Sequence, residues 1–328
     1  MAETTHSSPG RARPRLQRVR AVINQASGSV KADAEDQLNR LLAEHGVEAT
    51  VKAVAPDAVE AAVREAVDAA PDLLILLAGD GTARFAGELC GPDGPMLAPL
   101  AGGTMNMLPH ALYGAKPWRE ALEETLQHGE MRDVSGGEVD GRPFYVAAIL
   151  GAPALWAPAR EALRQGRLRL AVLRAQRAFK RAFAGRLRFA LDGREPGHAE
   201  ALTLMCPLVS RGDCGDDVLE ASALDPKGAA DAFRLGARTL LPGADWRKDP
   251  SVRVEACRTG RAWAKGRIPV VLDGEPHRLP SEVEVRFLPR AFRAYAPPET
   301  GAGERQGRRE EATAAAGVAA GEAAQKLR

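Results

Sequence analysis

Residues 72–82 read DLLILLAGDGT, and this stretch decides how the first part of the chain folds. Six apolar residues follow Asp72 without interruption, which is typical of a strand covered on both faces, as in a parallel sheet. Gly79 and Gly81 then mark the end of the strand and a tight turn into the next element. A buried strand followed by a glycine turn is a unit of an open α/β sheet.

The segments around this strand repeat the same rhythm. Residues 19–24 and 49–54 are predicted strands, and each is followed by apolar residues at helical spacing. In the helix after residue 54, Asp57 and Glu60 have the spacing of a capping box, which predicts Asp57 as the N-cap. The first half of the chain is therefore predicted to be a doubly wound α/β domain.

The pattern changes to a β-rich one after residue 130. Strand-like runs broken by Gly, Pro and Asp occupy residues 144–150, 187–191, 201–209, 252–256 and 283–288. Asp192–Gly193 and Asp273–Gly274 predict two tight turns. The second half is therefore predicted to be a mostly antiparallel β-sandwich, interrupted by residues 154–184, whose composition is helical.

These patterns define the expected domain boundaries. An α/β domain should occupy residues 18–130, with residues 287–298 as a segment that could complete it, and a β-rich domain should occupy residues 131–290. Residues 1–17 are polar, and residues 299–328 contain no aromatic side chain. Neither terminal segment can bury enough apolar surface to fold alone, so both are predicted to be disordered.

Composition excludes several classes of protein. The 328 residues carry a formal net charge of only +2, which gives no general attraction for nucleic acid. The four cysteines are scattered and form no CxxC pair, so neither a disulfide framework nor a zinc site is expected. The sequence shows no signal peptide and no apolar run long enough to span a membrane, so we expect a cytoplasmic protein whose membrane contact is peripheral.

Three glycine-rich turns fall where predicted strands end, with the sequences NQASG at 24–28, GDGT at 79–82 and GGTMN at 102–106. In an open α/β sheet, ligands bind beyond the carboxyl ends of the strands. Glycine lets backbone N–H groups approach phosphate oxygens there, and a following helix N-terminus adds positive potential. The predicted nucleotide-binding residues are Asn24, Ser27, Gly28, Gly79, Asp80, Gly81, Thr82, Gly102, Gly103, Thr104 and Asn106.

Asp80 must have a different use from the glycines beside it. A carboxylate repels a bare phosphate, so Asp80 should either hold a backbone turn or face a magnesium ion. The glycine spacing matches neither a GxxxxGKS or GxxxxGKT loop nor a GxGxxG fingerprint after the first strand. We therefore predict a site for a nucleotide and its metal that uses neither of these two motifs.

The three turns resemble the nucleotide-binding motifs of the diacylglycerol and sphingosine kinase superfamily, in the same order and spacing. Two later stretches extend the likeness, because GDDVLE at 215–220 resembles the metal loop of that family and LDGEP at 272–276 resembles its catalytic DGE turn. The likeness covers residues 19–290, roughly, and GDGT alone is also shared with NAD kinases. It implies an ATP site between an α/β domain and a β-sandwich domain, with a lipid entering the cleft.

The resemblance also implies roles in the second half. Asp273 and Glu275 would be the catalytic pair, with one carboxylate taking the proton of the attacking hydroxyl and the other orienting water or magnesium. Without the resemblance, Asp273–Gly274 would be read as an ordinary hairpin turn. A magnesium loop is implied as well, with Asp217 as the carboxylate ligand and backbone carbonyls near Cys214 and Leu219 completing the site. Without the resemblance, the acidic residues of this loop would be read as a solvated turn.

Residues 160–188 concentrate positive charge. Ten arginine and lysine side chains stand against the single acidic residue Glu161, and apolar residues are interleaved among them. Such a segment can lie on an anionic membrane surface with its arginines among the headgroups. The alternative is an exposed helix whose apolar residues face the protein core. A nucleic-acid partner is not expected, because aromatic residues for stacking are few.

The sequence therefore predicts a lipid kinase dependent on ATP and Mg2+, peripherally bound to the cytoplasmic membrane, with diacylglycerol as its first candidate acceptor. Ceramide or a sphingoid base could replace diacylglycerol as the acceptor. Two other functions stay open, namely a soluble kinase of the NAD kinase kind and a catalytically silent lipid-binding protein. The last is prompted by Ala78 and Arg84, which stand where the resembled family usually carries glycine and asparagine. The sequence leaves the oligomeric state undetermined.

Overall fold

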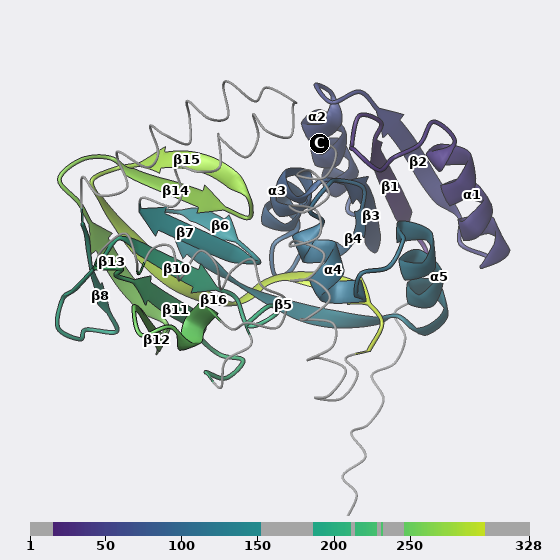
Figure 1. Ribbon diagram of the computed structural model, residues 1–328. Helices are drawn as coiled ribbons and strands as arrows, with labels where there is room; N and C mark the ends of the chain where they lie inside the picture. Colours follow the sequence, from purple (N-terminus) through teal and green to yellow (C-terminus); the bar gives the residue numbers. More distant parts are fainter. Residues whose placement is uncertain (1–15, 152–185, 211–213, 228–230, 232–245, 299–328) are drawn as a thin grey trace, which may run out of the picture.

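The computed structural model describes residues 16–151, 186–210, 214–227, 231 and 246–298, and Figure 1 draws these as ribbons. Several predicted features fall outside the described residues. They are most of the N-terminal segment 1–17, the tail 299–328, the helical stretch 154–184 and the basic segment before residue 186. Within the described part of the chain, no helix is long and apolar enough to cross a membrane.

Parallel strands build the first half of the molecule, as predicted. They lie in the order β2-β1-β3-β4, and each neighbouring pair is parallel. All six residues of β3, the strand within the DLLILLA stretch, are buried, since helices lie on both sides of the sheet (Figure 1). The strands are β1 (Val19–Asn24), β2 (Ala49–Val54), β3 (Leu73–Ala78) and β4 (Met96–Ala101).

Five helices accompany these strands, with α1 and α5 on one side of the sheet and α2 and α3 on the other (Figure 1). The capping-box prediction for α2 is wrong, because its N-cap is Ala58 and no side chain caps it. Val59 is buried at the first helical position, so packing rather than a cap sets where this helix begins. The helices are α1 (Ala34–Glu44), α2 (Val59–Asp68), α3 (Asp80–Cys90), α4 (Met107–Tyr113) and α5 (Trp118–His128).

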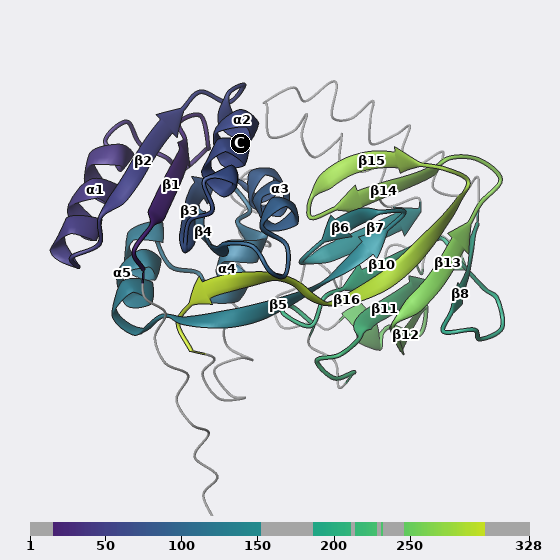
Figure 2. The same ribbon diagram turned by 180° about the vertical axis from the view of Figure 1, so that it is seen from behind.

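One long strand joins the two halves. In β16 (Glu282–Ala296), Ala294 pairs in parallel with Leu97 of β4. β16 also pairs antiparallel with β5 (Glu130–Val139) and with β13 (Thr259–Trp263). The parallel sheet is thereby extended into a ten-stranded mixed sheet that runs through both halves. Figure 2 shows β5 and β16 side by side along this passage.

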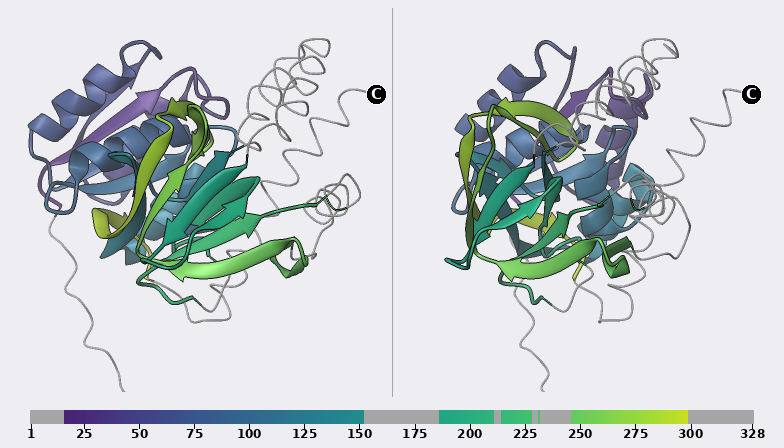
Figure 3. Two further views of the ribbon diagram at one scale, coloured as in Figure 1. Left: turned by 90° about the vertical axis from the view of Figure 1, so that its left-hand side faces the viewer. Right: turned by 60° about the vertical axis from the view of Figure 1, so that its left-hand side comes forward.

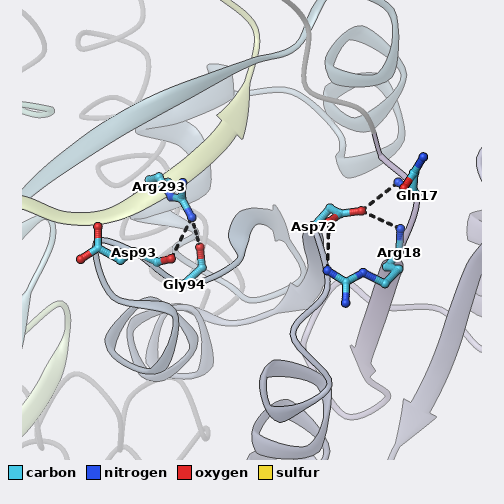
Figure 4. A network of polar contacts seen from close by, with 6 residues as sticks. All are labelled: Gln17, Arg18, Asp72, Asp93, Gly94 and Arg293. Carbon is cyan, nitrogen blue, oxygen red and sulfur yellow. Dashed lines mark hydrogen bonds and ion pairs between the residues drawn. The ribbon is translucent and has the colours of Figure 1, made fainter.

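Two sets of polar contacts anchor strands of this sheet (Figure 4). Arg293 of β16 donates hydrogen bonds to the backbone carbonyls of Asp93 and Gly94, which lie in the loop between α3 and β4. Asp72 accepts a hydrogen bond of 2.8 Å from the backbone N–H of Arg18, which holds the start of β1 beside the start of β3. In both sets, a side chain pairs with backbone groups that lie outside the strands.

The second half is a sandwich of two sheets, which confirms the predicted fold class. One layer is the outer part of the ten-stranded sheet, ordered β16-β13-β8-β9, and the other has six antiparallel strands ordered β12-β11-β10-β7-β14-β15. Apolar side chains from both layers fill the space between them, and Phe144, Leu204 and Leu272 are fully buried there. Figure 3 shows these layers beside the α/β half.

The remaining strands are mostly short, and the run predicted at 201–209 ends at Met205. They are β6 (Arg142–Phe144), β7 (Ala147–Gly151), β8 (Leu187–Leu191), β9 (Gly197–Ala199), β10 (Ala201–Met205), β11 (Leu219–Leu224), β12 (Val252–Cys257), β14 (Ile268–Leu272) and β15 (Glu275–Leu279), with a 3-10 helix at Trp246–Lys248.

The single strand predicted at residues 144–150 is in fact divided. β6 ends at Phe144 and β7 begins at Ala147. Between them, the backbone N–H groups of Tyr145 and Val146 donate to the carboxylate of Asp273. The apolar run is continuous in the sequence, so hydrophobic pattern alone cannot locate this break.

Candidate active site

The structure brings the three glycine turns together at the carboxyl end of the parallel strands. Gly103 packs on the GDGT turn, because a Cβ added to it would lie 2.7 Å from the Cα of Gly79. Gly28 of the first turn lies beside Thr104 of the third, whose Oγ1 would be 3.2 Å from a Cβ at position 28. Backbone approach this close requires glycine at position 103. The predicted nucleotide-binding turns thus form one contiguous surface.

Two asparagines shape these turns. Asn106, with a φ of 50°, accepts a 2.7 Å hydrogen bond from the N–H of Gly103 through Oδ1 and donates through Nδ2 to the Gly103 carbonyl at 3.1 Å. Asn24 accepts a 3.2 Å hydrogen bond from the N–H of Ala26 through Oδ1, and the N–H of Ser27 donates to the Asn24 carbonyl. Both side chains hold loop backbone and pair the N–H groups of Gly103 and Ala26 within the protein. The candidate phosphate contacts are therefore the N–H groups in the first turn of α3, which includes Gly81.

Asp80 holds a backbone turn, which is one of the two uses predicted for it. It is the first residue of α3, and its Oδ1 accepts a 3.3 Å hydrogen bond from the N–H of Leu108 in α4. Burial raises the pKa of Asp80, although hydrogen bonds from the backbone of residues 106–108 act in the opposite direction. Gly81 and Thr82 follow in the same first turn, where the helix N-terminus favours negatively charged groups.

Asp273 provides a second carboxylate, a buried one, from the other half of the molecule. It lies between β14 and β15 with a φ of 46°, next to Gly274 with a φ of 89°. Its carboxylate accepts hydrogen bonds from the backbone N–H groups of residues 145–147 at 2.8 to 3.0 Å. Burial nevertheless raises the pKa of Asp273 to about 6, and the negative charge of Asp80 acts in the same direction. The charge of Asp80 therefore acts on Asp273 across the boundary between the halves.

Glu275, the other residue of the predicted catalytic pair, touches α3 directly. A Cβ added to Gly81 would overlap the Glu275 carboxylate, so the acidic group lies against the first turn of the helix. Arg84 of the same helix binds it as well, with 2.9 Å between Arg84 Nη2 and Glu275 Oε2. The GDGT helix and the DGE turn are thus in contact, although 191 residues separate Arg84 from Glu275.

Sequence reasoning missed two parts of this arrangement. The N–H groups of residues 145–147 carry no sequence signal, because every residue other than proline has one. Arg84 stands out in the sequence only as a departure from the pattern of the resembled family, and no local pattern connects it with Glu275.

The predicted metal residues lie away from this cluster. Leu219 begins β11, and β10 and β7 separate that strand from β14, which places the two strands about 14 Å apart at the usual spacing. The Asp217 side chain is 84% exposed and pairs with Arg258 at 3.7 Å, while Cys214 is partly buried. Among the residues described, no group of three or more His, Cys, Asp or Glu side chains could hold a metal ion. The metal role of this loop stays a prediction.

The arrangement has the parts that phosphoryl transfer requires. Backbone N–H groups of the glycine turns and the start of α3 offer positive potential for phosphate oxygens. Asp273, with a pKa of about 6, is suited to take a proton near neutral pH. Its Oδ2 accepts one hydrogen bond among the described residues, from Tyr145, which leaves a lone pair for a substrate hydroxyl.

Comparison with known proteins identifies the first half. Residues 18–139 match the family model of the diacylglycerol kinase catalytic domain, which confirms the resemblance predicted from the three glycine turns. A sequence search of curated proteins gives no significant match.

Solved structures of kinases share the fold. A diacylglycerol kinase from Bacillus anthracis str. Sterne superimposes with a TM-score of 0.63 at 16% sequence identity, over 87% of this chain and 99% of that one. An NAD kinase from Archaeoglobus fulgidus in complex with ATP gives a TM-score of 0.50 at 11% identity, over 89% and 99% of the two chains. Identities this low establish the fold alone, an α/β half followed by an antiparallel β half.

Proposed function

We propose that this protein, whose residues 18–139 carry a diacylglycerol kinase catalytic domain, transfers the γ-phosphate of ATP to the hydroxyl of a membrane lipid. The family match supports a phosphotransferase with an alcohol acceptor. ATP as donor and a lipid as acceptor are the further steps of the proposal. Diacylglycerol is the first acceptor to test, and ceramide and sphingoid bases are the alternatives.

The observation that carries this proposal is the contact between the GDGT helix and the DGE turn. Through it, a buried carboxylate with a pKa of about 6 comes close to the turns whose N–H groups suit phosphate. A base and a phosphate site must be neighbours if a hydroxyl is to attack the γ-phosphorus in line. Neither element supplies both parts alone.

In this proposal the two carboxylates of the DGE turn have different roles. Asp273 accepts the proton of the acceptor hydroxyl while that oxygen bonds to the γ-phosphorus and the bond from phosphorus to the β–γ bridging oxygen breaks. The products are ADP and the phosphorylated acceptor, and Asp273 returns its proton to solvent. Glu275, whose carboxylate lies against the start of α3, orients water or the magnesium ion.

Magnesium accompanies the nucleotide in this proposal. The described residues fit that need, because the negative charge of Asp80 acts to raise the pKa of the buried Asp273 carboxylate and a cation relieves such repulsion. Mg2+ commonly binds one or two carboxylates together with nucleotide phosphates, and Asp80 would hold it. When bound, the ion would neutralise negative charge on the phosphate oxygens.

Peripheral membrane contact through residues 160–188 is also part of the proposal. Only the last three residues of this segment are described. Arg186 pairs with Asp225 at 2.8 Å, and the guanidinium of Arg188 lies 5.3 Å from the ring centre of Trp263. At this end the arginines contact the protein itself, so a membrane surface would have to be met by residues before 186.

The test is incubation of purified protein with radiolabelled ATP, magnesium and separate vesicle preparations that contain diacylglycerol, ceramide or sphingosine, followed by chromatography. NAD is included as a soluble acceptor, because the fold is shared with an NAD kinase. We expect one labelled lipid, which disappears with Asp273→Asn. Labelled NADP without labelled lipid would replace the proposal with a soluble kinase. Vesicle binding without any labelled product would replace it with a silent lipid-binding protein.

A further inference from the structure

Arg84 contacts the proposed catalytic turn, yet the mechanism above gives it no task. Its side chain is 15% exposed, and its Nη2 lies 2.9 Å from Oε2 of Glu275. Its Nη1 lies 3.8 Å from Oε2 of Glu88, one helical turn further along α3. The guanidinium is therefore held between two carboxylates. Its planar geometry fixes the position of the Glu275 carboxylate, which belongs to the DGE turn.

The position of Glu275 creates an electrostatic difficulty for ATP. Its carboxylate lies against Gly81, in the first turn of the helix whose N-terminus is the candidate phosphate site. An unpaired carboxylate there would repel the triphosphate, since like charges a few ångströms apart near a protein surface interact appreciably. Arg84 is the only ion-pair partner of Glu275 among the described residues.

The neighbouring histidine does not offer a second cation. His277 follows Glu275 by two residues on β15, and both side chains are half-buried on the same side of that strand. Burial lowers the pKa of His277, and the positive charges of Arg84 and Arg142 act in the same direction, against the charge of Glu275. The imidazole is therefore neutral at pH 7, and the charge of Glu275 is balanced from α3.

We propose that Arg84 is a positioning residue for ATP, which fixes the Glu275 carboxylate at the start of α3 and cancels its charge so that the triphosphate can approach the GDGT turn. This inference rests on the proposed kinase function. Arg84 departs from the pattern of the resembled family, and in this role it supports nucleotide binding instead of making the protein catalytically silent.

The experiment measures kcat and the KM for ATP in the lipid kinase assay. The variants are Arg84→Gln, Glu275→Gln, the double variant that combines them, and Arg84→Lys. Arg286→Gln is the matched control, because Arg286 forms a 2.7 Å ion pair with Glu138 between β16 and β5, away from the glycine turns. Thermal unfolding of each variant verifies that it is folded, and Arg84→Met replaces Arg84→Gln if the latter does not fold.

Arg84→Gln should raise the KM for ATP by about five- to tenfold, because Glu275 then repels the triphosphate. The double variant should return the KM to within about twofold of Glu275→Gln alone, because the uncompensated charge is gone. Arg84→Lys keeps the charge and should keep most of the affinity, and Arg286→Gln should match the unmodified protein.

Two results would overturn the inference while leaving the kinase function intact. One is an Arg84→Gln variant whose KM for ATP equals that of Arg286→Gln. The other is a double variant whose KM is the product of the two single effects, which would show that Arg84 acts independently of Glu275. An unmodified protein that phosphorylates no acceptor would overturn the proposed function and this inference with it.

Discussion

Two of the three Asp-Gly turns in the described part of the β half have the same backbone and opposite chemistry. Asp192–Gly193 has φ values of 47° and 71°, and Asp273–Gly274 has φ values of 46° and 89°. Both aspartates accept hydrogen bonds from backbone N–H groups of a neighbouring segment. Asp192 is exposed, whereas Asp273 is 5% exposed and comes close to α3. The dipeptide determines the turn, and the surroundings determine what its carboxylate can do.

The balance between burial and hydrogen bonding explains the difference. At Asp192, limited burial acts to raise the pKa, but hydrogen bonds from the backbone of Thr259 and Arg258 prevail and lower it. At Asp273, three backbone hydrogen bonds act to lower the pKa, but complete burial prevails and raises it to about 6. At Asp273 the loss of solvent outweighs three backbone hydrogen bonds, whereas at the exposed Asp192 it does not.

The largest effect should separate the two aspartates in catalysis. Asp273→Asn should lower kcat in the lipid kinase assay by about 100- to 10,000-fold, since it removes a general base. Asp192→Asn should change kcat by less than about twofold. Thermal unfolding and circular dichroism of both variants serve as the fold control. Equal kcat losses in two folded variants would contradict the catalytic role that we assign to Asp273 from its burial.

The pH dependence of kcat should sharpen the comparison. Activity should fall about tenfold per pH unit below a pKa of about 6, because Asp273 must be deprotonated to accept a proton. Asp192→Asn should leave this acidic limb unchanged. The measurement is a kcat profile from pH 5 to 8 at saturating ATP and lipid, with protein stability checked at each pH. An acidic limb centred near pH 4 would contradict the assignment of the base.

Stability should respond to pH with opposite sign at the two turns. The pKa of Asp273 is raised above its ordinary 3.8, so its contribution is fully present below that pH and is lost as the pH rises through about 6. Relative to Asp273→Asn, the unmodified protein should therefore lose about 1–3 kcal/mol of unfolding free energy between pH 4 and 7.

The pKa of Asp192 is lowered, so its contribution is present above pH 3.8 and is lost as the pH falls through the folded value. Relative to Asp192→Asn, the unmodified protein should lose stability only on acidification. Urea unfolding at pH 4, 5.5 and 7 measures both differences. The same pH dependence of the unfolding free-energy difference for both variants would contradict the predicted opposite signs.

The smallest effect tests the backbone that the turns share. Gly193 and Gly274 both have positive φ, and a Cβ on either would meet no atom within 4 Å. Gly193→Ala and Gly274→Ala should each cost about 1 kcal/mol of unfolding free energy, since alanine is strained in this conformation. Only Gly274→Ala should also reduce kcat, because the flanking carboxylates would shift. Calorimetry and the kinase assay report the two quantities.

Much of the site could be read from local sequence. The apolar strand before the GDGT turn and the Asp-Gly pairs follow from local pattern and backbone conformation, whereas the close approach of Gly79 and Gly103 joins two turns that are distant in sequence. The division of the strand at Tyr145 and Val146 could not be read, because it depends on a carboxylate more than 120 residues away. The capping pattern at Asp57 fails for a similar reason, since packing of Val59 sets the start of α2.

By itself the sequence determined the α/β half, the β-rich half and the residues of the glycine and DGE turns, because periodicity and turn chemistry are local properties. Only the tertiary structure decided that β16 joins the halves in one sheet and that the DGE turn meets α3 through Arg84 and Glu275. It also decided that one of two like aspartates is buried and has a pKa of about 6. Burial and long-range contact depend on how distant segments pack, and no local pattern contains that information.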